Sequence, residues 1–163
     1  MKRSKPKTLP IGEISSGTFR AEDIVPELVY LAKQVRMNRE DRKRINTLVR
    51  EWDTLEDEDD SSTAHSWWNS VGTDRNTDIE ILADLYNILD FYAPPYCYLG
   101  SLEGDGACIG VWLAQDAIDE ALAEGEIARN DEPMGQALYR LVVSDHGNMT
   151  LYTRQGREVW GIV

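Results

Sequence analysis

The hydrophobic repeat of the chain changes at two adjacent prolines, Pro94 and Pro95. Before them, apolar residues recur every three or four positions, which is the period of an amphipathic helix. After them, apolar and polar residues alternate, which is the period of a strand with one buried face. Because proline ends a helix and restricts the residue before it, the boundary is expected here. The sequence therefore predicts an α+β protein, helical over 20–93 and mainly β over 96–163.

Three helices are expected before the prolines. The first begins near residues 21–23, where Pro26 would still fall in the opening turn. The second runs over 39–55, and the third begins at Asp78. Before them, residues 1–10 hold four Lys or Arg and two Pro with little to bury, which predicts a flexible basic tail.

Five strands and one short helix are expected after the prolines. The strands cover 96–101, 107–113, 138–144, 148–154 and 157–163. Because short, glycine-containing turns join most of them, neighbouring strands should be antiparallel. The predicted fold is a single domain, residues 11–163, in which the N-terminal helices pack on one face of a roughly five-stranded antiparallel sheet.

Charge is divided unevenly along the chain. Residues 1–50 carry 12 basic and 6 acidic groups, a net of +6, and residues 51–163 carry 5 and 23, a net of −18. The total of −12 disfavours direct binding to duplex DNA, because the phosphates would be repelled. An acidic protein of this kind is expected to bind a basic surface on another protein, or to imitate a nucleic acid.

Two neighbouring features could form a binding surface. An acidic run at Glu56, Asp57, Glu58, Asp59 and Asp60 could mimic a line of phosphates, or it could be a solvated loop. The tryptophans Trp67 and Trp68 follow it, and tryptophan is enriched among interface anchors. Alternatively, one of the two rings covers the helical core and the other lies on the surface.

Two turns carry the other candidate residues. Glycines surround Asp105 in the segment SLEGDGA, which is typical of a bulged hairpin turn and lacks the lysine of a phosphate-binding loop. If this turn met the SDHGN turn, then Glu103, Asp105, Asp145 and His146 could bind a small ligand or a divalent metal, or act in acid–base catalysis. The main interpretation remains geometric: the glycines allow the chain to reverse, with no catalytic residue, metal or cofactor.

Several further properties follow from the residue pattern. The basic segment Arg36–Arg44 offers a third hypothesis, in which the second helix binds RNA or another negative partner. The apolar stripe of that helix could support a homodimer. No apolar run is long enough to cross a membrane and no apolar signal core follows the N-terminus, so a cytoplasmic protein is expected.

The C-terminal half contains a PPYCY strand at residues 94–98, a GDG turn and a DHGN hairpin near the end. In these features it resembles a family of small uncharacterised bacteriophage and prophage proteins. The segment ISSGTFRAEDIVPEL, residues 14–28, is similar to the same family's opening. The resemblance implies a mobile-element context, in which small acidic proteins often inhibit host or defence machinery. Together with the charge, it predicts a non-enzymatic protein that binds and inhibits or modulates a host or defence protein.

Overall fold

The computed structural model describes residues 7–59 and 74–163, while the side chains of residues 55–59 and 74–76 are outside that description. Within these ranges, three helices precede the prolines: α1 (Ala21–Gln34), α2 (Arg39–Asp59) and α3 (Asp74–Asp90). The second helix is longer than its apolar stripe predicts, so the acidic run begins inside α2 instead of in a loop. Asp60, Trp67 and Trp68 lie outside the described residues.

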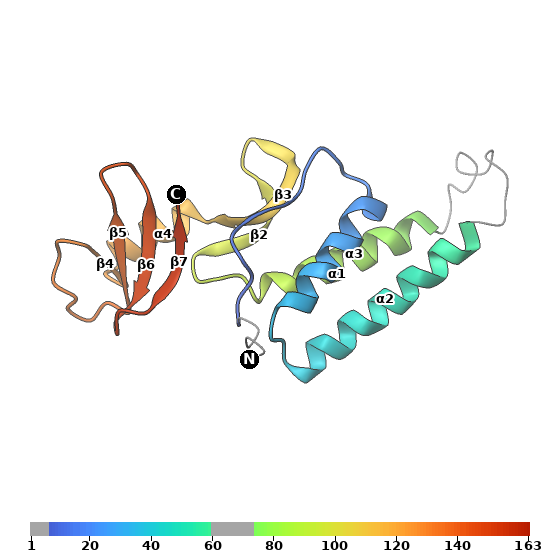
Figure 1. The fold of residues 1–163 in the computed structure, drawn as a ribbon, viewed down its shortest axis with the longest axis horizontal. Coiled ribbons are helices and arrows are strands. Elements are labelled where there is room, and N and C mark those ends of the chain that lie inside the picture. The colour runs from blue at the N-terminus through green and yellow to red at the C-terminus, as the bar shows by residue number, and fades with distance from the viewer. Residues whose placement is uncertain (1–6, 60–73) are drawn as a thin grey trace, which may run out of the picture.

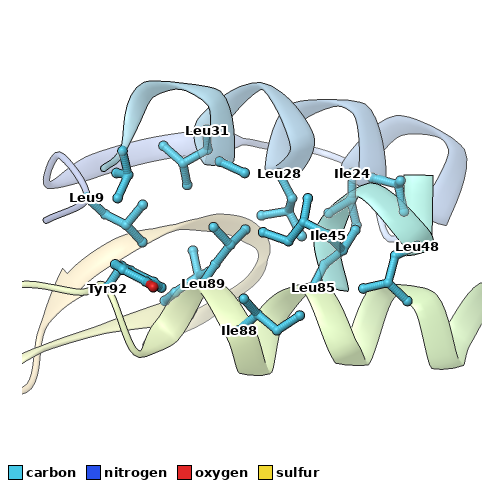
Figure 2. Packing of buried hydrophobic residues seen from close by; sticks show 14 of the residues in the cluster. Leu9, Ile24, Leu28, Leu31, Ile45, Leu48, Leu85, Ile88, Leu89 and Tyr92 are labelled. Carbon is cyan, nitrogen blue, oxygen red and sulfur yellow. The ribbon is translucent and has the colours of Figure 1, made fainter. Parts of the chain in front are cut away.

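The three helices form most of the first hydrophobic core. Apolar residues of α1 and α3 alternate along their shared face, and α2 packs against both (Figure 2). The central residues are Ile24, Leu28, Leu31, Ile45, Leu48, Leu85, Ile88 and Leu89. Within α2 the stripe residues Ile45, Leu48 and Trp52 are buried against the other helices of the same chain. Leu9 is also buried here and donates its N–H to Tyr92 O at 2.8 Å, so the packed part of the chain begins before residue 11.

Hydrogen bonds connect the start of α2 to Tyr92, which lies just after the end of α3. Asn38 caps α2, because its Oδ1 accepts the Asp41 N–H at 2.8 Å. The Tyr92 hydroxyl donates to Asp41 Oδ2 at 2.6 Å and accepts the Asn38 N–H at 3.1 Å. This connection sets where the chain turns between α1 and α2.

A small antiparallel sheet completes the first core. It contains β1 (Gly12–Ser15), β2 (Cys97–Leu102) and β3 (Asp105–Leu113), in the order β1-β3-β2. Its inner face, with Leu99, Ile109 and Val111, is buried against the helices. Its outer face carries residues of the opposite parity, as the period of two requires.

A second sheet has its own core. The helix α4 (Gln115–Ala123) packs with four strands in the order β4-β5-β6-β7. These are β4 (Ile127–Arg129), β5 (Tyr139–Val143), β6 (Met149–Thr153) and β7 (Glu158–Ile162). The buried side chains are Ile118, Ala121, Ile127, Leu141, Leu151 and Trp160.

The predicted α+β class is confirmed, but the prediction of a single five-stranded antiparallel sheet is wrong. The five predicted strands exist as β2, β3, β5, β6 and β7, and they divide between two sheets (Figure 1). The strand β3 has β1 on one edge and β2 on the other, so no later strand can pair with it. The pair β4–β5 is also parallel, not antiparallel.

The two sheets meet at the segment that follows the prolines. The Trp160 indole N–H donates to Pro95 O at 2.8 Å, and the Ala114 N–H donates to Tyr96 O at 2.9 Å. Tyr96 has a φ of 61°, which is unusual for a residue other than glycine. Ile11 and Cys97 pack against both cores. Contacts from both halves of the chain therefore converge on residues 95–97.

Candidate functional site

The first acidic turn is a bulged hairpin, as its glycines predict. Leu102 pairs with Asp105, the register shifts between Ser101 and Leu102, and Gly104 has a φ of 84°. Asp105 Oδ1 accepts the Ala107 N–H at 3.2 Å, so this carboxylate takes part in the turn itself.

The second turn joins β5 to β6 and is held by its own backbone. The Gly147 N–H donates to Ser144 O at 2.9 Å, and Gly147 has a φ of 84°. Asp145 and His146 are exposed at its tip. This turn and the first belong to different sheets (Figure 1).

The four polar residues of the two turns do not form a metal centre. In the part of the chain that the structure describes, no group of three or more His, Cys, Asp or Glu could hold a metal ion.

The two cysteines are not activated as nucleophiles. Burial raises the pKa of Cys97 to about 12, and burial with the Glu13 carboxylate raises that of Cys108, so both remain thiols at neutral pH.

Exposed carboxylates dominate the surface of α4 and of the strands after it. The acidic residues of this part are Asp116, Asp119, Glu120, Glu124, Glu126, Asp131, Glu132, Asp145 and Glu158, and all are exposed. Within the described ranges, the ion pair Arg20–Glu22 is the one found, and it lies far along the chain from them. The carboxylates of residues 114–163 therefore form no ion pair with a described residue, and two of them, Asp119 and Glu132, accept hydrogen bonds from Gln115 and from the Arg129 N–H.

Two of the four arginines in the same part have structural roles. Arg140 Nη1 donates to the backbone oxygens of Arg129, Asn130 and Glu132, at 2.7 to 3.1 Å. Arg154 Nη1 donates to the backbone oxygens of residues 135 and 137 at 3.0 and 3.1 Å. Both guanidinium groups hold the long connection between β4 and β5 and donate there to backbone oxygens.

Acids at the C-terminal end of α4 oppose its stability. Glu124 is the C-cap, and the last turn contains no basic residue. Negative charge there is unfavourable, because the end of a helix carries a partial negative charge. We expect Glu124→Lys to raise the free energy of unfolding by about 0.3–1 kcal/mol at low salt, as measured by urea denaturation. Glu80→Lys, the same charge change in the middle of α3, serves as the control; an equal gain there would show that only net charge matters.

A cleft of about 800 Å³ lies where the two sheets meet. Its walls come from β1, the outer face of β2 and β3, the start of α4 and the end of β7. Two carboxylates, Glu103 and Asp116, line it, and none of its lining residues is Lys, Arg or His. Of the four residues proposed in the two turns, only Glu103 reaches this cleft.

Two aromatic rings form the floor of the cleft. Tyr98 and Trp112 are direct cross-strand partners on β2 and β3, and the next pair on the same face is Gly100 with Gly110. The Trp112 ring lies on Gly110, where an added Cβ would come within 2.5 Å of it. The Tyr98 ring lies on Gly100, at 3.3 Å from the corresponding position.

The sequence-based prediction does not include the two aromatic rings on the floor of the cleft, although a sequence pattern indicates them. The segments YLG and GVW place an aromatic residue two positions from a glycine, and residues at i and i+2 share a face of a strand. A glycine beside a large ring on one face allows the ring to lie flat on the backbone.

Among the described helices, none is long and apolar enough to cross a membrane.

Comparisons of the chain with protein-family models, with curated proteins and with solved structures found no match.

Proposed function

We propose that this protein is a non-enzymatic binding protein that attaches to a basic surface on another protein. The observation that carries the proposal is the set of exposed carboxylates on residues 114–163, which form no ion pair with any described residue. Unpaired surface charge contributes little to folding, but it accelerates encounter with an oppositely charged partner and orients it. The unfavourable acids at the end of α4 support the same interpretation, because they lower stability where they stand.

The resemblance to phage and prophage proteins supports a host or defence protein as the partner. In the sharpest version of the proposal the acidic surface imitates DNA and competes with it for that partner. The end of α2, with residues 56–59 of the acidic run, lies at the opposite end of the molecule from α4 (Figure 1), so this run and the tryptophan pair at 67 and 68 would make a separate contact with the partner. The side chains of 56–59 and all of residues 60, 67 and 68 lie outside what the structure describes.

The acidic surface of α4 can be tested with a short poly-lysine peptide and calorimetry. The test variant is the triple change Asp119→Asn, Glu120→Gln and Glu124→Gln, all at exposed positions. We expect it to bind the peptide roughly fivefold more weakly, because each exposed charge contributes a few tenths of a kcal/mol or more. Wild-type binding should also weaken steeply from ~0.01 M to ~1 M salt, as the screening length falls from ~30 Å to ~3 Å.

A matched control changes three exposed acids of the helical part: Glu27→Gln, Glu80→Gln and Asp84→Asn. It should bind the peptide like the wild type. Equal weakening in both variants would mean that only net charge is sensed, and would contradict a defined surface. Used as baits for affinity capture, the wild type and the control should retain a partner that the α4 variant loses. If duplex DNA then fails to displace that partner, the DNA-mimic version is wrong.

A further inference from the structure

The two rings on the cleft floor can offer a ligand mainly their faces. The Trp112 indole N–H donates to Gly100 O at 3.0 Å, and the Tyr98 hydroxyl donates to Ser101 O at 3.1 Å. Their N–H and O–H donors are therefore already used by the backbone of β2. The face of an aromatic ring carries negative potential and attracts a cation.

The charges around the rings favour the same kind of ligand. Glu103 and Asp116 contribute up to two negative charges to the cleft, and no lining side chain is basic. The start of α4 also lies at the cleft, and a helix N-terminus contributes only about half a positive charge. The net field of the cleft is therefore negative.

We propose that the cleft binds the guanidinium group of an arginine in an extended segment of the partner protein. The inference rests on the proposed function, because it names the side chain by which a basic partner is held. A guanidinium is planar, stacks on aromatic rings and forms paired hydrogen bonds with carboxylates, so it fits this cleft better than an ammonium group.

The surroundings of the cleft fit a polypeptide ligand. Its volume of about 800 Å³ exceeds what a single side chain fills, which leaves room for the adjoining backbone. The strand β7 borders it through Gly161 and Ile162, and its outer edge pairs with no strand in the described chain. An extended segment can add to such an edge by main-chain hydrogen bonds while one of its side chains enters the cleft.

The test uses a capped peptide with a single arginine between glycine and serine residues. A second peptide carries citrulline, which has nearly the shape of arginine but no charge. Both are titrated into the ¹⁵N-labelled full-length protein and followed by two-dimensional NMR. The arginine peptide is expected to shift the Trp112 indole and the Gly100 and Gly110 amide signals saturably. The citrulline peptide should bind about fivefold or more weakly, because the cation–π and ionic contributions are lost.

Two cleft variants extend the test. Glu103→Gln with Asp116→Asn changes two exposed side chains and should weaken arginine binding about fivefold or more. Glu27→Gln with Glu80→Gln makes the same charge change elsewhere and should leave it unaltered. Trp112→Leu removes the main ring, and a circular dichroism spectrum shows whether that variant folds. If it does not fold, the carboxylate variant alone decides.

Three results would overturn the inference. Equal affinity for the citrulline peptide would show that charge is not recognised. Shifts confined to α4 would place the peptide on the acidic surface. Saturable shifts of the Trp112, Gly100 and Gly110 signals by a neutral disaccharide, but not by the arginine peptide, would make the cleft a sugar site.

The two proposals can fail separately. If poly-lysine binding depends on the α4 acids while the arginine peptide leaves the cleft signals unchanged, only the inference fails; in the reverse case, only the acidic-surface proposal fails.

Discussion

Leu151→Ala is expected to lower the free energy of unfolding by about 3–5 kcal/mol, as for other fully buried leucines. Leu151 has 0% of its surface exposed and lies among the buried residues of the second core. Replacing it by alanine removes apolar contacts and leaves a cavity that the packed neighbours can fill only in part. The loss would be a large share of the marginal stability that is typical of a single domain.

Urea denaturation followed by circular dichroism and by tryptophan fluorescence measures this effect. Leu138→Ala is the matched control, since Leu138 is 57% exposed and should change stability by less than about 0.5 kcal/mol. The two probes should give coincident transitions, because Ile11 and Cys97 pack against both cores and couple them. A loss below about 1 kcal/mol for Leu151→Ala would contradict the packing described for the second sheet.

Gly110→Ala is expected to cost about 2–3 kcal/mol, because there is no room for a methyl group. Its Cβ would lie 2.4 Å from Gly12 O and 2.5 Å from the Trp112 ring. Neither neighbour can move easily, since one is the backbone of β1 and the other is held by its hydrogen bond to Gly100 O. The ring would have to tilt, so arginine binding in the cleft should weaken in the same variant.

Gly106→Ala in the same strand is the control. A Cβ there would meet only the Phe19 ring at 3.7 Å, an ordinary contact, so its stability should stay close to that of the wild type. Thermal unfolding of the two variants side by side separates crowding from the general effect of replacing a glycine in β3. If both lost the same amount, the close approach of β1, Trp112 and Gly110 would not be the cause.

The helices and most of the strands could be predicted from the sequence because their periods are local properties. The change of period at Pro94 and Pro95 marks the boundary that the structure has. The partners of the strands could not be predicted in this way, because a period of two says which face is buried but not which strand lies alongside. The strand β1 has only four residues and a positive φ at Gly12, so its sequence gives little indication that it occupies an edge of β3.

The candidate site was predictable only in part. The abundance of acids after residue 113 is visible in the sequence, and the glycine-rich turn indicates Glu103 as a candidate. That Glu103 lines one cleft together with Asp116 and two rings depends on how the sheets meet. This meeting is set by long-range contacts, such as the Trp160 hydrogen bond to Pro95 O, that no local pattern reveals.

The link from β3 to α4 is a single residue, Ala114, and its N–H is bonded to Tyr96 O. A connection of one residue has little conformational freedom, and the hydrogen bond restricts it further. The short link limits how far the walls of the cleft can move apart, so we expect the cleft to keep its shape in the absence of a ligand. A ligand then loses conformational freedom when it binds, but the protein does not have to become ordered. This favours rapid association without rearrangement of the protein.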